Sequence, residues 1–425
     1  MARFLFASTA LAGHVNPGLP LVRALTAAGH RVRFMTGSAF EDAVTRAGAE
    51  FVAGPPEADF REPNLDRQFP ERAAYQGIKQ LQWDLANVFV APTTAQAERV
   101  RKLLAEEPAD AIVSDVSCYG PILEAERARL PIALYGISVL PFPSVDLAPF
   151  GLGLAPMSGP AGRLRNRVLH ALVRRAVFGF SIGLMDAQRA RVGLPPAGRT
   201  PIEIAEPPAA YLQMSPRGFD YPRSDLPEWV HFLGHPRASA PDPDWTPPAW
   251  WDEVTRGDRP VVVVTQGTLA TDPDALVRPA IAGLADEDVL VVALSAGADP
   301  AVLGPLPANT RAAAYLPFGG LFRHASVVVT NGGFGGVQTA IAHGVPLVVA
   351  GRSEDKVEVT ARVAFSGVGV NLRTGTPKPA AVRDGVRRVL HEPGFAARAR
   401  ALRDEAGDTD PAARAVEVLE RLLNR

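Results

Sequence analysis

The chain has 425 residues, which at about 100 to 200 residues per domain predicts two or three domains and not one small binding module. Lysine and arginine number 44 and aspartate and glutamate 45, so no overall positive field is available to hold nucleic acid or an anionic membrane. The single cysteine, Cys118, excludes an internal disulfide framework and a zinc site built on several thiolates, and is typical of a cytoplasmic protein.

The N-terminal segment opens a strand, loop, helix and strand. Residues 4–7 are apolar, as in a short signal peptide, but Ser8 and Thr9 break the run and a helix follows, so we interpret it as a buried strand. Asn16 is then expected to cap the helix, Pro17 to occupy its first turn and Gly29 to end it. With a further strand at 31–35, this unit predicts a right-handed parallel crossover.

The same alternation recurs along the chain and predicts an α/β fold of two doubly wound domains. Short apolar runs at 111–114 and 132–135 extend the first sheet, and runs at 261–264, 289–294, 311–314, 327–329 and 347–349 form the second. Prolines crowd the stretch between them. We therefore expect a first domain at 1–215, a linker at 216–255, a second domain at 256–408 and a closing helix within 409–425. The sequence contains no run of about 18 apolar residues, so no membrane span is predicted.

A glycine-rich turn follows a buried strand in the second half. In the run Asn331-Gly332-Gly333-Phe334-Gly335-Gly336, the glycines allow a tight turn, and the free N–H groups of the next helix predict a phosphate site without lysine. The alternative is a turn made only for close packing of strand and helix. A second alternative is an NAD site, because Glu354 and Asp355 follow the glycines at roughly the 20-residue spacing of a ribose-binding acid.

A histidine and an aspartate are predicted at the carboxyl edge of the first sheet. His14 lies in the loop after the first strand, and Asp115 directly follows the strand at 111–114. An imidazole there can accept a proton from a hydroxyl if the carboxylate fixes its tautomer. The alternatives are a loop histidine bonded to backbone and an aspartate that caps the following helix.

Other catalytic chemistries find little support. The remaining histidines are scattered without metal-ligand spacing, so no metal site is predicted. No G-x-S-x-G nucleophile elbow is present. Cys118 begins a predicted helix, where its pKa would be lowered, but a buried small residue is the simpler interpretation.

In this order and spacing, three features carry a family resemblance: the loop Gly13-His14-Val15-Asn16-Pro17, the late glycine-rich turn with Gly344-Val345-Pro346, and Glu354-Asp355-Lys356. Together they resemble the nucleotide-sugar-dependent glycosyltransferases of family 1, most closely the bacterial macrolide and natural-product branch. The resemblance spans nearly the whole chain. It implies two Rossmann-like domains facing across a cleft (the GT-B fold), with the acceptor in the first and the donor mainly in the second.

The resemblance also implies roles for individual residues. His14 would deprotonate the acceptor and Asp115 would be its partner. Tyr315 would stack on the nucleotide base, the glycine-rich turn would hold the diphosphate, and Asp355 and Lys356 would contact sugar hydroxyls. The donor-binding residues implied in this way are Gly13, Thr268, Tyr315, Leu316, Asn331, Gly332, Gly333, Phe334, Gly335, Gly336, Asp355 and Lys356.

This sequence departs from the family pattern at three of these positions. The family usually has His at the position of Asn331, Ser or Thr at that of Gly336, and Gln at that of Lys356. The first two differences leave more of the phosphate site to backbone N–H groups and the Asn amide. Lys356 would meet a sugar hydroxyl, a carboxylated sugar or a phosphate oxygen.

These observations predict an inverting glycosyltransferase that moves a sugar from UDP or dTDP to a hydroxyl, or an amine, of a small hydrophobic natural product. No metal and no cofactor besides the donor are expected, and the protein would be a cytoplasmic monomer or homodimer without nucleic-acid partners. An NAD-linked oxidoreductase and a catalytically silent activator of the same fold are the alternatives. Aromatic residues of the first domain would line the acceptor pocket: Phe60, Phe69, Tyr75, Trp83, Phe89, Phe142 and Phe150.

Overall fold

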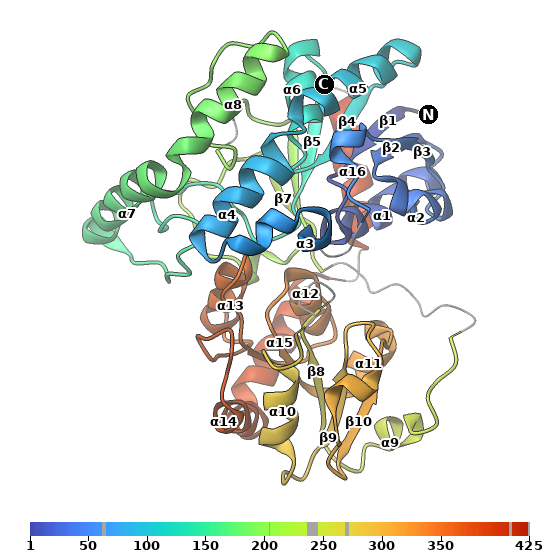
Figure 1. The fold of residues 1–425 in the computed structure, drawn as a ribbon, viewed down its shortest axis with the longest axis vertical. Helices are drawn as coiled ribbons and strands as arrows, with labels where there is room; N and C mark the ends of the chain where they lie inside the picture. Colours follow the sequence, from blue (N-terminus) through green and yellow to red (C-terminus); the bar gives the residue numbers. More distant parts are fainter. Residues whose placement is uncertain (62–64, 204, 236–244, 268–271, 408–409, 424–425) are drawn as a thin grey trace.

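The computed structural model describes residues 1–425 except 62–64, 204, 236–244, 268–271, 408–409 and 424–425, and shows two α/β domains stacked end to end (Figure 1). The first is built on a parallel sheet of seven strands in the order β3-β2-β1-β4-β5-β6-β7, and the second on a parallel sheet of six in the order β10-β9-β8-β11-β12-β13. In both sheets the strand order reverses beside the first strand of the domain, as in doubly wound folds. The predicted fold class is confirmed.

The strands of the first sheet are β1 (Arg3–Ala7), β2 (Arg31–Thr36), β3 (Glu50–Ala53), β4 (Ala111–Asp115), β5 (Ile132–Tyr135), β6 (Ala210–Gln213) and β7 (Val230–Phe232). The helices of this domain are α1 (Ala12–Ala27), α2 (Glu41–Arg46), α3 (Leu65–Gln68), α4 (Ile78–Asp84), α5 (Thr93–Glu106), α6 (Tyr119–Ala128), α7 (Gly159–Val173) and α8 (Gly179–Arg191). Side chains 4–7 of β1 are almost wholly buried, because helices cover both faces of a parallel sheet. The N-terminal run is therefore a central strand.

The strands of the second sheet are β8 (Val261–Thr265), β9 (Leu290–Leu294), β10 (Thr310–Ala313), β11 (Ala325–Thr330), β12 (Leu347–Val349) and β13 (Gly369–Asn371). The helices that follow β7 are α9 (Trp251–Arg256), α10 (Val277–Leu284), α11 (Phe318–Leu321), α12 (Phe334–Ala342), α13 (Lys356–Phe365), α14 (Pro379–His391), α15 (Pro393–Glu405) and α16 (Pro411–Leu423). Valine-rich strands such as β8 are buried along their whole length, which explains why their sequences do not alternate.

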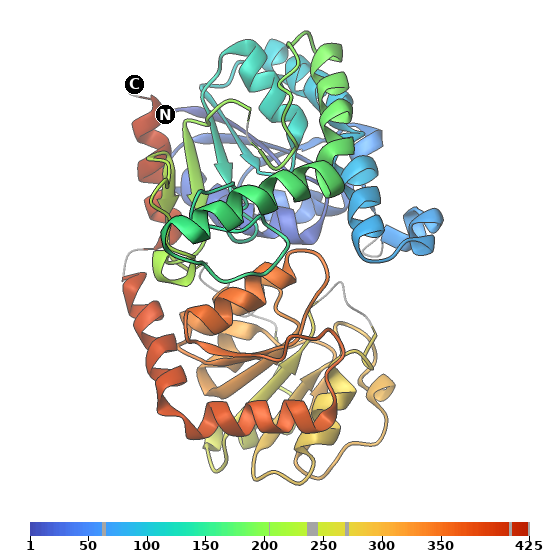
Figure 2. The same ribbon diagram turned by 90° about the vertical axis from the view of Figure 1, so that its left-hand side faces the viewer.

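Two boundaries differ from the sequence-based expectation. Strand β7 pairs with β6, so the first sheet extends into the stretch predicted as linker. Helix α16 returns to the first domain and packs on α1 and β6, and Figures 1 and 2 show it beside the N-terminus. The side chain of His30 contacts Glu420 of α16 at 3.0 Å. The last helix thus ties the second half of the chain to the first domain.

One helical segment among the described residues, Gly159–Arg191, is long and apolar enough by length and composition to cross a membrane. A single helix of this kind is weak evidence of a span, since core helices and signal sequences meet the same criteria. Only 17% of its most apolar window is buried against the protein. The exposed face of this segment is considered below.

Candidate active site

His14 and Asp115 meet at the carboxyl edge of the first sheet. Asp115 is the last residue of β4, and His14 lies just beyond the neighbouring strand β1. The Nδ1 atom of His14 is 3.2 Å from Oδ1 of Asp115. The predicted pair is therefore formed, although 101 residues separate its members in the sequence.

The prediction that His14 lies in a loop is wrong. Helix α1 begins at Ala12, with Leu11 as its N-cap residue, so His14 is in the first turn and Asn16 and Pro17 lie inside the helix. The N–H groups of a first helical turn have no partner within the helix, and here the N–H of His14 donates to the carbonyl of Leu11 at 2.9 Å. Helical geometry thereby fixes the direction in which the imidazole leaves the backbone.

The carboxylate of Asp115 is fully buried and held by three donors. Its Oδ2 accepts the N–H of Thr9 at 2.6 Å, and its Oδ1 accepts the N–H of Ser117 at 2.7 Å besides contacting His14. Burial opposes ionisation, but the His14 imidazole and the two N–H groups outweigh it and lower the pKa of Asp115. An ionised carboxylate accepts only, so Nδ1 of His14 is the donor in this pair, and in the neutral imidazole the lone pair is then on Nε2.

Aromatic side chains surround the imidazole on one side. The ring of Phe89 lies 5.6 Å from that of His14, centroid to centroid. Phe69 contacts both Phe60 and Trp83 edge to face in the same apolar cluster. These rings give the region beside His14 the apolar character predicted for an acceptor site.

Phe142, Phe150 and Tyr75 do not join this cluster. Phe142 packs edge to face on Tyr211 and Trp229 in a separate apolar cluster of the first domain. Phe150 packs against the main core, and Tyr75 is exposed on its surface. The apolar sequence pattern did not distinguish core positions from positions at the sheet edge.

The glycine-rich turn joins β11 to α12 at the carboxyl edge of the second sheet. Gly332 has φ of +84°, and a Cβ atom there would lie 2.4 Å from the Thr360 side chain, so only glycine fits. Gly333 is the N-cap residue of α12, and Gly335 and Gly336 lie in the first turn with open space where a Cβ would be. Among the described residues no partner is recorded for the N–H groups of Gly335 and Gly336, as an anion site requires.

Asn331 contributes to this turn differently from the expectation. Its Nδ2 donates to the carbonyl of Gln266 at 2.5 Å, and its Oδ1 lies 3.4 Å from the N–H of Gly333. The amide of Asn331 thus connects the ends of β8 and β11. One N–H of its amide group is therefore used within the protein.

The predicted base-binding segment follows β10. Tyr315 is 67% exposed, whereas its neighbour Leu316 is buried. The exposed ring has a face available for stacking, while Leu316 anchors the segment in the core. Thr268, predicted to contact the diphosphate, lies outside the described residues.

The predicted sugar-binding pair stands at the start of α13. Asp355 is its N-cap residue and accepts a hydrogen bond from Ser138, a residue that follows β5 in the first domain. Because these two residues follow the carboxyl ends of β5 and β12, their contact shows that the carboxyl edges of the two sheets face each other. Burial raises the pKa of Asp355. Lys356 forms an ion pair with Glu354, which neutralises its charge.

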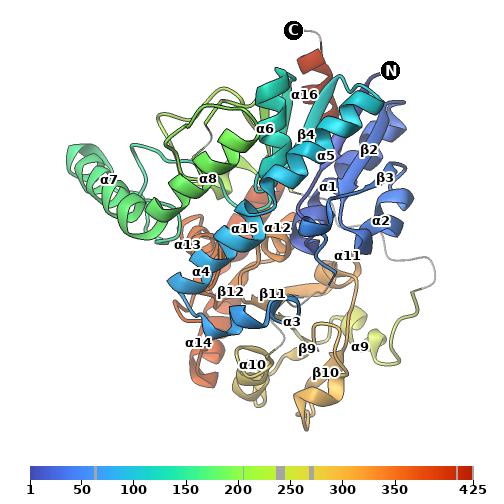
Figure 3. The same cartoon turned by 45° about the horizontal axis from the view of Figure 1, so that its top comes forward.

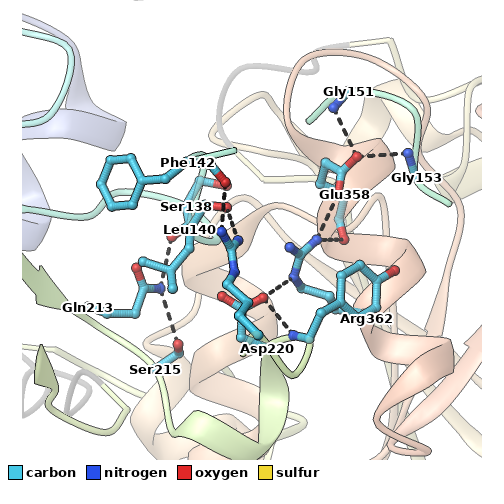
Figure 4. Close-up of polar contacts among 12 residues, drawn as sticks. Ser138, Leu140, Phe142, Gly151, Gly153, Gln213, Ser215, Asp220, Glu358 and Arg362 are labelled. Atoms are coloured by element: carbon cyan, nitrogen blue, oxygen red, sulfur yellow. Dashed lines mark hydrogen bonds and ion pairs between the residues drawn. The ribbon is translucent and has the colours of Figure 1, made fainter. Parts of the chain in front are cut away.

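Four residues at this domain interface were not predicted. Glu358 and Arg362 of α13 are buried against residues of the first domain, and Arg362 pairs with Asp220 at 2.6 Å (Figure 4). Ser138 is the fourth. Glutamate and arginine four residues apart on a helix ordinarily predict an exposed pair, and no local pattern shows that a second domain covers them.

Metal and thiol chemistry find no basis in the described part of the chain. No group of three or more His, Cys, Asp and Glu residues there is arranged to hold a metal ion. Cys118 is buried, and burial together with the nearby Asp115 raises its pKa well above the ordinary value. The thiol is therefore a packing residue and not a nucleophile.

Comparison with known proteins places these features in a family. Residues 279–423 match the family described as the C-terminal domain of erythromycin biosynthesis protein CIII-like proteins. Over 99% of the chain, the sequence is 44% identical to the whole of 4'-demethylrebeccamycin synthase from Lentzea aerocolonigenes. It is also 33% identical to UDP-glycosyltransferase 2 from Phaeomoniella chlamydospora over 94% of the chain and 91% of that protein. The solved structure of CalG4, the calicheamicin glycosyltransferase, superposes with a TM-score of 0.76 and 25% identity, covering 100% of this chain and 99% of CalG4.

Two facing Rossmann-like domains, with an imidazole at one sheet edge and open helix N–H groups at the other, define a glycosyltransferase of the GT-B fold. The chain belongs to the family 1 nucleotide-sugar-dependent glycosyltransferases, in the bacterial natural-product branch. It is thus a sugar-transferring enzyme of natural-product biosynthesis. The oxidoreductase alternative is set aside, because the glycine-rich turn follows the fourth strand of its domain and not the first, as a dinucleotide fold requires.

Proposed function

We propose that the protein is an inverting glycosyltransferase in which His14 is the general base. The Asp115 carboxylate fixes the Nδ1–H tautomer, which leaves Nε2 to accept a proton. It takes the proton of an acceptor hydroxyl or amine as the acceptor oxygen or nitrogen attacks the anomeric carbon. Direct attack on the face opposite the nucleotide inverts the configuration. One observation supports the proposal most directly: the buried carboxylate of Asp115 accepts from three donors, and one of them is the His14 imidazole at the carboxyl edge of the first sheet.

The departing nucleoside diphosphate is stabilised by the first turn of α12. Negative charge develops on the diphosphate as the glycosidic bond breaks, and the N–H groups of Gly335 and Gly336, with the positive end of the helix, are oriented to meet it. These groups need no metal ion. Tyr315 stacks on the base of UDP or dTDP, and Asp355 accepts hydrogen bonds from sugar hydroxyls.

The acceptor lies against the first domain beside His14. The rings of Phe60, Phe69, Trp83 and Phe89 favour a flat, apolar compound with a hydroxyl or an amine over a polar sugar chain. The names of 4'-demethylrebeccamycin synthase and the calicheamicin glycosyltransferase support a natural-product acceptor of this kind. The reaction takes place in the cytoplasm, where nucleotide sugars are made.

The test is the His14→Ala variant, assayed for sugar transfer and for nucleotide binding. We expect loss of transfer with unchanged affinity for UDP or dTDP, because the base and the diphosphate site lie in different domains. Normal turnover in this variant would remove His14 from the mechanism. Thermal stabilisation by UDP or dTDP, and none by NADH, is the matching expectation for the donor.

A further inference from the structure

Helix α13 is bonded to the first domain by more than the Ser138 contact, and these bonds form one connected network (Figure 4). Oε1 of Glu358 accepts the N–H groups of Gly151 at 2.9 Å and Gly153 at 2.7 Å. Oε2 of the same carboxylate pairs with Arg362 at 2.7 Å. Both carboxylate oxygens of Glu358 therefore have partners: Oε1 in a turn of the first domain and Oε2 in α13 itself.

Arg362 continues the network into the first domain. Its side chain is 2% exposed, its Nε donates to Asp220 at 2.6 Å, and its guanidinium lies 4.1 Å from the centroid of the Tyr221 ring. Burial opposes the charge of Arg362, but the carboxylates of Asp220 and Glu358 hold its pKa above the ordinary value. Removing three charges from water is costly, so such a network is weak evidence of a contribution to stability. It is consistent with a role in fixing the geometry of the two domains.

The turn at 151–153 reaches α13 closely enough to require glycine. Gly153 has φ of +60°, and a Cβ atom there would lie 2.6 Å from the Val357 side chain and 2.9 Å from its carbonyl oxygen. This turn lies in the long connection between β5 and α7, which begins at the carboxyl edge of the first sheet. Figure 2 shows the connection passing directly over α13 at the junction of the two domains.

We propose that Glu358 and Arg362 are positioning residues that hold the donor-side helix α13, and with it Asp355, in register with the acceptor-side turn at 151–153. The proposal rests on the proposed function, since it assumes that Asp355 contacts the donor sugar. A nucleotide sugar that settles against α13 would thereby order the acceptor side of the site. Neither side chain touches the reacting atoms.

The first test compares substitutions at two glycines that both have a positive φ angle. Gly153→Ala forces the turn away from Val357, whereas Gly159→Ala, at φ of +79°, introduces its Cβ into open space. Kinetics are measured with UDP-glucose and the compound that the wild type converts fastest in a panel of hydroxylated aromatics. We expect Gly153→Ala and Glu358→Gln to raise the acceptor KM or lower kcat at least about 10-fold with the donor KM unchanged, as the loss of a charge-assisted hydrogen bond implies. Gly159→Ala should match the wild type. Equal kinetics in all four proteins would overturn the proposal.

The second test needs no acceptor and no turnover. Hydrogen exchange in the peptide containing residues 151–153 should be slow in the free wild-type protein and faster in Glu358→Gln, and UDP or dTDP should slow it further only in the wild type and Gly159→Ala. Exchange that is unaffected by Glu358→Gln would contradict the proposed bonds. Failure of the proposed function is separate, because it appears as an active His14→Ala variant or as no nucleotide effect on the peptide that begins α12.

An independent observation concerns the exposed face of Gly159–Arg191, which projects from the side of the first domain (Figures 1 and 3). Five large apolar side chains on it are each at least 40% exposed. Leu164, Val168 and Leu172 are four residues apart and follow one side of α7, and Phe180 and Leu184 are four residues apart on α8. Gly162 and Asn166 occupy the opposite, buried side.

The charged residues beside the α7 part of this apolar face are basic. Helix α7 and the π-helical turn that follows it (Arg174–Phe178) carry five arginines and no acidic residue. Arg163 pairs with Asp146 and Arg174 with Glu203, whereas Arg167 and Arg175 are exposed and have no recorded ion-pair partner among the described residues. An exposed apolar stripe with arginines beside it is the pattern of a helix that lies in a membrane interface.

We infer that this face binds the surface of an anionic membrane without crossing it. The charge argues against a second copy as the occupant, because a symmetric contact through this face would bring the same arginines together. An anionic surface attracts the arginines that have no acidic partner, and the apolar side chains then insert among the headgroups. An apolar acceptor that partitions into membranes would meet the enzyme there.

The test is sedimentation with vesicles of phosphatidylcholine, with and without phosphatidylserine. We expect the wild type to bind only the anionic vesicles. The Leu164→Ser/Leu172→Ser double variant should lose at least about 10-fold in affinity, since two apolar side chains no longer insert. Leu306→Ser, an exposed leucine of the second domain, should bind like the wild type. No binding by the wild type would overturn the inference, as would a dimer in sedimentation velocity that the double variant dissociates.

Discussion

Replacement of Asp115 by Asn tests the catalytic pair most sharply, because the side chain keeps its shape and loses only its charge. In the wild type both carboxylate oxygens accept: Oδ2 from Thr9 at 2.6 Å, and Oδ1 from Ser117 at 2.7 Å and His14 at 3.2 Å. An Asn side chain has one acceptor oxygen, so in either orientation its NH2 group faces a donor. Where it faces His14, the imidazole must carry its proton on Nε2, the atom that needs a free lone pair.

We therefore expect Asp115→Asn to lose the contribution of general base catalysis, about 10²- to 10⁴-fold in kcat, which corresponds to about 3 to 5 kcal/mol. Affinity for UDP or dTDP should not change. The assay is kcat at saturating donor and acceptor, with circular dichroism to confirm folding, because a buried donor left unsatisfied costs about 1–3 kcal/mol of stability. Asp110→Asn is the matched control, since it makes the same chemical change in an exposed pair with Arg3.

The pH dependence of stability should follow the same carboxylate. The pKa of Asp115 is lower in the folded protein than in the unfolded chain, so its stabilising contribution is present above the unfolded pKa and is lost as pH falls through the folded pKa. The wild type should therefore lose more stability on acidification than Asp115→Asn does.

A kcat in Asp115→Asn indistinguishable from that of wild type would refute the catalytic role assigned to His14 and Asp115.

Three further predictions concern the donor site. Gly335→Asp should weaken UDP or dTDP binding about 10- to 100-fold relative to Gly335→Asn, because a like charge near 5 Å costs about 3 kcal/mol at an effective dielectric constant of 20. The melting temperature should not fall, since an acidic residue is favourable in the first turn of α12. Equal affinities of the two variants in calorimetry would place the diphosphate elsewhere. Tyr315→Ala should weaken nucleotide binding by about 1–3 kcal/mol with little change in stability, since the ring is exposed, and Tyr315→Phe should bind normally; unchanged affinity in the alanine variant would exclude stacking. Lys356→Gln should leave nucleotide affinity unchanged, because Glu354 already neutralises the ammonium group, and the wild type should not prefer UDP-glucuronate over UDP-glucose; a large loss of affinity would place Lys356 on a phosphate.

The buried strands and their order along the chain could be predicted from the sequence, because a parallel sheet covered on both faces leaves unbroken apolar runs. Strands β3, β6, β7 and β13 are only three or four residues long and were not predicted. β7 in particular lies in a proline-rich stretch that is typical of a linker. The start of α1 was placed too late because Asn16 and Pro17 resemble a helix start although they lie inside the helix.

His14, Asp115 and the glycine-rich turn could be predicted because each stands where a strand ends, and parallel strands bring their carboxyl ends to one edge. The network of Asp220, Glu358 and Arg362 could not, since 142 residues separate Arg362 from Asp220 and only the contact between domains buries them. The bond from Asn331 to Gln266 likewise depends on a neighbouring strand. Contacts between domains are the part of this site that a local sequence pattern does not contain.

The most direct measurement is a crystal structure with a nucleoside diphosphate and an acceptor bound. We predict that the terminal phosphate accepts hydrogen bonds from the N–H groups of Gly335 and Gly336, and that the reacting oxygen or nitrogen of the acceptor lies about 3 Å from Nε2 of His14. A diphosphate bound away from the start of α12, or an acceptor that approaches the sugar from a side that His14 does not reach, would contradict the mechanism.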